Sequence, residues 1–196
     1  MIFWQDFIIL DLEYTDARLC ITTKTIPSII EVGMLRVSAE GKLQGQYESL
    51  VQPLQPETMS EFIHELTGIT REELAIAPTF NTVYKEIISF IGNYPVVSWT
   101  GVDRFILQKN IEFACFLWPQ RLQWWDIMSI LTERYFQNTG LKLSSKLGKA
   151  CEQIGVVYEN KHRALSDCKA VLNLMTYIAA RPLEKEKESK FEIYEV

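Results

Sequence analysis

The acidic residues that interrupt apolar segments are the first candidates for chemistry in this sequence. Asp11 and Glu13 stand two positions apart in ILDLEYT, so a strand would turn both side chains to the same face. Asp103, in VVSWTGVDRFIL, would open a helix directly after a strand. Each feature alone has an ordinary explanation, either a strand end that reaches water or an acidic residue favoured at a helix N-terminus.

A fourth acidic residue lies beside one of only two histidines in the chain, in KHRALSDCKAV. Asp167 follows Ala164 by three positions and precedes Val171 by four, which places it at the edge of the apolar face of a helix. His162 stands just before that helix. A surface aspartate and a capping histidine would explain either residue, but they explain the pair less well.

Four carboxylates at the ends or edges of buried elements would repel one another if they met. Two divalent cations, Mg²⁺ or Mn²⁺, would offset this repulsion, because these ions prefer carboxylate and water oxygens. Two such ions suit in-line attack on a phosphodiester, and the attacking water needs a base. A histidine titrates near neutral pH and suits that role. The residues therefore predict a metal site with His162 as general base.

Hydrophobic periodicity predicts the elements that would position these residues. Apolar runs indicate strands at 7–12, 28–37, 45–52 and 95–98, and QWWDI indicates an edge strand at 123–127. Helical spacing and stop signals indicate helices within 56–68, 78–93, 103–115, 127–136, 143–155 and 163–179. Three strands followed by alternating strands and helices predict an α/β domain with a mixed sheet covered by helices.

Composition narrows the class of protein. The 196 residues, 47% hydrophobic and 23% charged, suit one globular domain, predicted at 1–182, followed by a charged tail at 183–196. We expect a cytoplasmic protein, because no apolar run is long enough to span a bilayer and the N-terminus does not resemble a signal peptide. Four cysteines without a C-x-x-C pair favour reduced, buried thiols over zinc or disulfides. A net charge of −5 argues against coating of nucleic acid by bulk electrostatics.

In this order, Asp11-x-Glu13, Asp103 and His162-x4-Asp167 resemble the motifs of the DEDDh branch of the DEDD 3′–5′ exonucleases, over roughly residues 5–180. SEFIHELTGITREELAIAPTF, VSWTGVDRFIL and LKLSSKLGKACEQIGV are similar to segments of the Eri-like exoribonucleases. The resemblance implies a ribonuclease H-like fold, with a mixed five-stranded sheet flanked by helices.

The resemblance also implies roles for individual residues. Asp11, Glu13 and Asp167 would bind the first metal ion, Asp11 would reach the second, and Asp103 would hold water on the metal. His162 would be the general base, and nucleoside 5′-monophosphates would leave the 3′ end of single-stranded RNA or DNA. Four further residues are expected near the substrate: Leu12 at the terminal base, Thr15 at the terminal sugar, and His64 and Trp99, for which helix capping and core packing are the ordinary alternatives.

The sequence leaves several functions of the chain open. Tyr14 follows Glu13 where the family usually has a smaller residue. The chain could be a catalytically silent module that binds nucleic acid or regulates another protein, or a ribonuclease H-like endonuclease. A glycosidase using Asp11 and Glu13 would leave Asp103 and the histidine motif unexplained. Homodimers occur in parts of the family, but no motif here specifies one, and the sequence does not decide between RNA and DNA.

Overall fold

The computed structural model describes residues 5–18 and 25–180 as one α/β domain. The predicted tail, 183–196, and the last residues of the predicted domain, 181–182, lie outside the described residues. Cys20 lies outside them as well. No helix in the described ranges has the length and apolarity that crossing a membrane requires.

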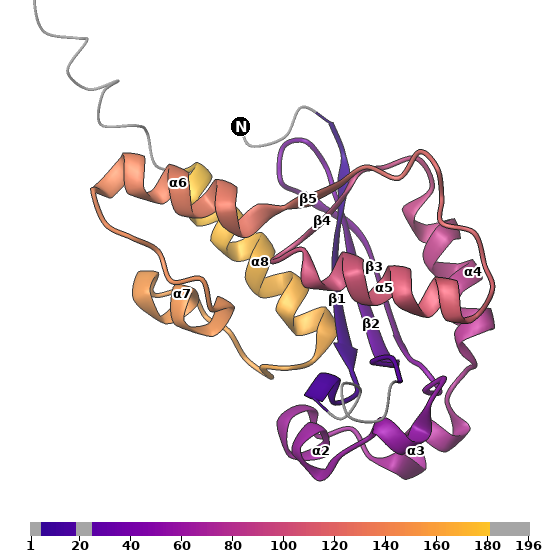
Figure 1. Ribbon diagram of the computed structural model, residues 1–196. Helices are drawn as coiled ribbons and strands as arrows, with labels where there is room; N and C mark the ends of the chain where they lie inside the picture. Colours follow the sequence, from indigo (N-terminus) through magenta and orange to yellow (C-terminus); the bar gives the residue numbers. More distant parts are fainter. Residues whose placement is uncertain (1–4, 19–24, 181–196) are drawn as a thin grey trace, which may run out of the picture.

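A five-stranded mixed sheet forms the centre of the domain (Figure 1), in the order β3-β2-β1-β4-β5. β1 pairs antiparallel with β2, and β2 with β3, whereas β4 runs parallel to both β1 and β5. The predicted mixed five-stranded sheet is therefore confirmed. The strands are β1 (Phe7–Tyr14), β2 (Ile29–Val37), β3 (Leu43–Leu50), β4 (Val96–Ser98) and β5 (Trp124–Asp126).

The alternation of β1 side chains divides the core into two layers. Phe7 and Ile9 pack with residues of α6, α7 and α8, whereas Ile8, Leu10 and Leu12 pack with residues of α4 and α5. Each layer is closed by helices whose apolar faces the periodicity predicts. These helices are α4 (Phe80–Ile91), α5 (Val102–Phe113), α6 (Ile127–Thr139), α7 (Leu147–Ile154) and α8 (Ala164–Ala179).

Two short helices lie beyond the C-terminal end of β1 (Figure 1), and the prediction of a single helix at 56–68 is wrong in detail. Residues 56–58 form a separate 3₁₀ turn, and α2 (Glu61–Thr67) begins after Ser60, whose side chain caps Ile63. α3 (Arg71–Ile76) was not predicted. Thr70 and Glu73 form a capping box at its start, which is the sequence signal that indicates it.

Other boundaries shift by a few residues. Helix α7 begins at Leu147, because residues 143–146 form an irregular segment before it. Among the described cysteines, Cys151 and Cys168 are buried free thiols, as expected, but Cys115 is exposed.

Candidate active site

The two acidic residues of β1 project from the face of the sheet that α8 covers. Asp11 lies opposite Gly33 of β2, and Glu13 lies opposite Glu31. Because cross-strand partners share a face, Glu13 and Glu31 are like charges held side by side. Only 9% of Glu13 is exposed.

Asp103 reaches the same region from the other layer. It stands in the first turn of α5, which follows β4 after a short bend, and only 6% of it is exposed. Its Oδ1 accepts a hydrogen bond of 3.2 Å from the backbone N–H of Leu12. This bond ties the start of α5 to the residue between the two acids of β1.

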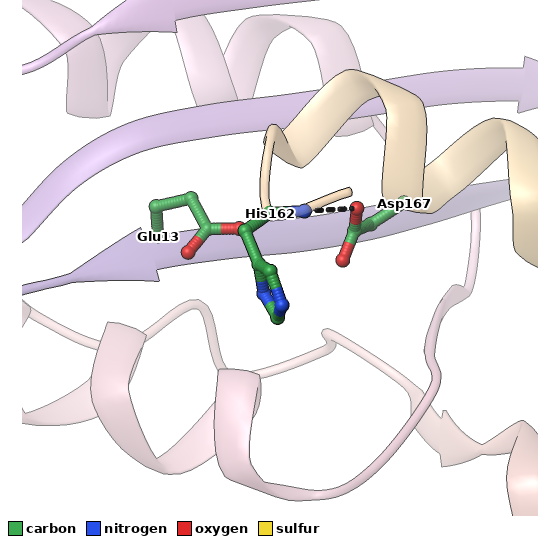
Figure 2. Close-up of side chains that lie close together, drawn as sticks. All are labelled: Glu13, His162 and Asp167. Carbon is green, nitrogen blue, oxygen red and sulfur yellow. Dashed lines mark hydrogen bonds between the residues drawn. The ribbon is translucent and has the colours of Figure 1, made fainter. Parts of the chain in front are cut away.

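Asp167 and His162 come from the start of α8. Oδ1 of Asp167 accepts hydrogen bonds from the hydroxyl of Tyr158 at 2.6 Å and from the backbone N–H of His162 at 3.2 Å. His162 is exposed and has a φ of 62°, a left-handed conformation that is uncommon for residues other than glycine. Figure 2 shows the His162 ring gathered with the carboxylates of Glu13 and Asp167 where α8 begins.

A cavity of about 430 Å³ brings all five residues together. Its lining contains the four carboxylates and the histidine of the predicted set: Asp11, Glu13, Asp103, His162 and Asp167. The lining also contains apolar and aromatic side chains, including Leu12, Tyr14, Phe62, Leu66, Trp99 and Val102. Apolar side chains together with convergent polar groups are typical of a ligand site.

Burial and mutual repulsion raise the pKa values of these carboxyl groups. Burial is the larger cause at Asp11, whose pKa lies well above its ordinary value, and the other acids add to the shift. Burial followed by Asp167 and Glu31 raises the pKa of Glu13 to about 8, and burial raises that of Asp103 to about 7. Strongly shifted carboxyl pKa values in a cleft are a common feature of functional sites.

The pKa of Asp167 is also raised by burial, although the hydrogen bond from Tyr158 lowers it again in part. The Tyr158 hydroxyl thus favours the ionised form of Asp167, as the Leu12 amide favours that of Asp103. Tyr158 was not among the predicted residues.

Glu13, His162 and Asp167 are the group that fits a metal ion in the described part of the chain. One ligand atom from each lies within 4.8 Å of the others. Asp11 and Asp103 line the same cavity but do not belong to this tight group. This group offers two carboxylates and an imidazole, a donor set that fits a divalent cation.

The four predicted substrate residues have different environments. Leu12 and Trp99 line the cavity, and Trp99 is fixed by a 2.8 Å hydrogen bond from Nε1 to the carbonyl of Ser145. Thr15 also borders the cavity, but its buried hydroxyl is bonded to the backbone N–H of Ser28 and to Thr58. That hydroxyl therefore accepts two hydrogen bonds within the protein, and its place at the terminal sugar stays a prediction.

His64 lies on α2, but the α2 residues that line the cavity are Phe62, Ile63 and Leu66. Nδ1 of His64 is instead 3.0 Å from the carbonyl oxygen of Ile69. This contact matches the capping alternative.

Phe62 is a cavity residue that the sequence did not single out. It is 48% exposed, and the guanidinium of Arg18 lies 4.4 Å from the centre of its ring. Asp16 holds Arg18 through bonds to Nε and Nη2, and the pKa of Asp16 falls to about 2 because of these bonds. The sequence signal that could have indicated Phe62 is a large aromatic residue in a short segment predicted to be helical.

Comparison with known proteins agrees with this geometry. The model of the RNase T exonuclease family matches residues 8–175. The chain belongs to this exonuclease family. The predicted family resemblance is thereby confirmed.

Curated relatives of this exonuclease chain are larger proteins. It is 27% identical over 177 residues to a Mycobacterium tuberculosis protein named as a bifunctional exonuclease/endonuclease, and 23% identical over 198 residues to DNA polymerase III PolC-type of Bacillus cereus. These alignments cover 89% and 92% of the chain but only 26% and 12% of the relatives. The chain thus spans about a quarter or less of their length.

Solved structures share the fold of this exonuclease at about 20% identity. Cell-death related nuclease 4 (CRN-4) superimposes with a TM-score of 0.78, covering 90% of this chain and 64% of that one. The nuclease domain of 3′hExo, a DEDDh family member bound to rAMP, superimposes with a TM-score of 0.74, covering 91% and 93%.

Proposed function

We propose that this chain is a metal-dependent 3′–5′ exonuclease that hydrolyses single-stranded RNA or DNA to nucleoside 5′-monophosphates. The observation that carries the proposal is the cavity in which four carboxylates and a histidine from β1, α5 and the start of α8 converge. Membership of an exonuclease family agrees with it.

Asp11, Glu13 and Asp167 would hold two divalent cations, Mg²⁺ or Mn²⁺. When bound, these cations would supply positive charge to the phosphate oxygens and lower the barrier to in-line displacement. Oxygen ligands suffice for such ions, which leaves the exposed imidazole of His162 available as the base. Its ring nitrogen would accept the proton of the attacking water.

The remaining residues would orient the substrate. Oδ1 of Asp103 is bonded to the amide of Leu12, which leaves Oδ2 to hold water in the cavity. The terminal base would pack between Leu12, Trp99 and the exposed ring of Phe62. Stacking on aromatic rings tolerates any base, which suits an exonuclease. A cytoplasmic location stays a prediction from the sequence, and the sequence leaves the oligomeric state open.

The test is a gel assay with 5′-labelled single-stranded RNA and with DNA of the same sequence. Mg²⁺, Mn²⁺ or a chelator is added in parallel, and Asp167→Asn serves as the contamination control. We expect a metal-dependent ladder that shortens one nucleotide at a time. Discrete internal cuts would favour an endonuclease, and binding without cleavage would favour a silent module.

A His162→Ala variant separates metal binding from proton transfer. It should bind Mn²⁺ through the carboxylates yet lose about 10²–10⁴-fold in kcat, the usual contribution of a general base. Calorimetry without substrate measures the first quantity and the ladder assay measures the second. Full activity at neutral pH would rule out the assigned base.

A further inference from the structure

Glu31 is a buried carboxylate that the proposed reaction does not use. It lies on β2 directly opposite Glu13, and no part of it is exposed. A charge in such a place is costly unless it is paired and hydrogen-bonded. Its partners lie 132 and 133 positions later in the chain, at the start of α8.

Arg163 forms a two-pronged ion pair with Glu31. Its Nε lies 2.9 Å from Oε1 and 3.2 Å from Oε2, and its Nη2 lies 2.5 Å from Oε1. The backbone N–H of Ala164, the first residue of α8, donates to Oε2 at 2.8 Å. The N-cap residue of α8, Arg163, makes no side-chain capping bond. The Glu31 carboxylate, which belongs to β2, instead accepts a hydrogen bond from one of the N–H groups that the helix leaves free at its start.

Gly33 fixes the distance between the same two elements. It lies two positions after Glu31 and therefore on the same face of β2. A Cβ at this position would lie 2.3 Å from the carbonyl carbon of Ala164 and 2.3 Å from the nitrogen of Leu165. The strand and the first turn of α8 thus meet backbone to backbone, with Glu31 bonding that turn from the side.

The residues held in this way are the direct neighbours of the predicted base. His162 precedes Arg163 in a left-handed conformation, and its N–H points to Asp167. The amide of Asp167 donates in turn to the carbonyl of Arg163 at 3.0 Å. Because Glu31 fixes Arg163 and Ala164, it also restricts the backbone positions of His162, which precedes them, and of Asp167, which follows them.

We propose that Glu31 is a positioning residue of the exonuclease, which acts through Arg163 and the amide of Ala164 to keep His162 aligned with the carboxylates of β1. The inference rests on the proposed role of His162. Glu31 touches no reacting atom. A misplaced base costs rate, since catalytic groups must be held within a fraction of an ångström of their working geometry.

The kinetic test uses Glu31→Gln, Arg163→Gln, Arg163→Lys and the Glu31→Gln/Arg163→Gln double variant. Glu152→Gln is the matched control, because it breaks the nearby exposed ion pair with Lys161 and leaves Arg163 untouched. Outer partners of this kind typically contribute about 10–100-fold to activity. We expect such a loss of kcat in both Gln variants, with KM changed less than about threefold.

The pattern among the variants distinguishes positioning from general weakening of the fold. Arg163→Lys keeps the positive charge but loses the two-pronged contact of the guanidinium. Its kcat should therefore lie between those of the wild type and Arg163→Gln. The double variant should be no slower than the slower single variant, because both changes remove one interaction. The Arg163 side chain is 41% exposed and Glu31 is fully buried, so Glu31→Gln should fold even if Arg163→Gln, which leaves the buried carboxylate unpaired, does not.

A second readout does not need activity. The chain has two histidines, so the ring signals of His162 and His64 can be resolved by NMR in chelator and assigned with His162→Ala. The His162 signal should move in Glu31→Gln and Arg163→Gln but not in Glu152→Gln, and the His64 signal should stay in place. If wild-type protein degraded nothing, the proposed function would fail, and this arm would still decide whether the pair positions His162. Unchanged kcat and an unchanged His162 signal in both variants would overturn the inference.

Discussion

Replacing Glu13 by glutamine should stabilise the metal-free protein while it removes activity. Glu13 is 9% exposed and lies beside Asp167, Glu31 and Asp103, and its pKa is raised to about 8. Glutamine has nearly the same size but cannot ionise. The substitution therefore removes a repelled charge without opening a cavity.

The magnitude follows from the pKa of Glu13. The gap between about 8 and the ordinary value of 4.5 would correspond to about 5 kcal/mol if this group ionised alone. The carboxylates of the cluster titrate together, so we expect relief of about 1–3 kcal/mol from one substitution. In a domain of this size that is about 2–12 °C in Tm.

The sign depends on pH. The folded state holds the proton of Glu13 more tightly than the unfolded chain does, so the wild type loses stability as the pH rises from about 4.5 to about 8. Glutamine does not titrate, so Glu13→Gln lacks this loss of stability. The Tm advantage of Glu13→Gln should be near zero at pH 5 and reach its full size at pH 8.

Thermal melts in chelator at pH 5, 6.5 and 8 measure this difference. Glu65→Gln is the control, because Glu65 is exposed on α2 and the substitution removes the same charge. Added Mn²⁺ should stabilise the wild type more than Glu13→Gln, because binding to the folded state raises Tm. A Glu13→Gln advantage that did not grow between pH 5 and pH 8 would refute the electrostatic account of the site.

Three further predictions concern the residues that support the site. Tyr158→Phe should weaken Mn²⁺ binding about 3–10-fold at pH 7, measured by calorimetry. The substitution removes the hydrogen bond that favours the ionised form of Asp167. Equal affinity in the variant would mean that Tyr158 only packs against the site. Gly33→Ala should cost about 3 kcal/mol or more in chemical denaturation, since its Cβ would meet the backbone of α8. Asn110→Ala should cost about 1–3 kcal/mol, because the Asn110 side chain bonds the amide of Ile29 and the carbonyl of Pro27; in both cases a loss under 0.5 kcal/mol would contradict the geometry.

Much of the carboxylate arrangement could be predicted from the sequence because it depends on strand and helix periodicity. Two acids two positions apart on a strand must share a face, and Asp103 after β4 must reach the same edge because β4 runs parallel beside β1. The cavity with Asp11, Glu13, Asp103, His162 and Asp167 has the composition that the motifs predict.

Contacts that depend on loop conformation could not be predicted in the same way. The hydroxyl of Thr15 turns to Ser28 and Thr58, and the ring of His64 turns to Ile69, because nearby loops offer them partners. Tyr158 reaches Asp167 from the segment before α8, which has no periodic pattern. The pairing of Glu31 with Arg163 joins residues 132 positions apart, and no local signal indicates it.

The raised pKa values of the cluster also explain how the site can be assembled before metal arrives. Protons can neutralise Glu13 and Asp103 up to about pH 7–8, so folding need not bring four full charges together. Divalent cations would have to displace these protons, so metal binding should become tighter as the pH rises. Rising pH therefore weakens the metal-free fold while it favours the metal-loaded form. Burial of the two apolar layers on either side of β1 stabilises the fold. This stabilisation offsets the free-energy cost of the carboxylate cluster in the metal-free protein.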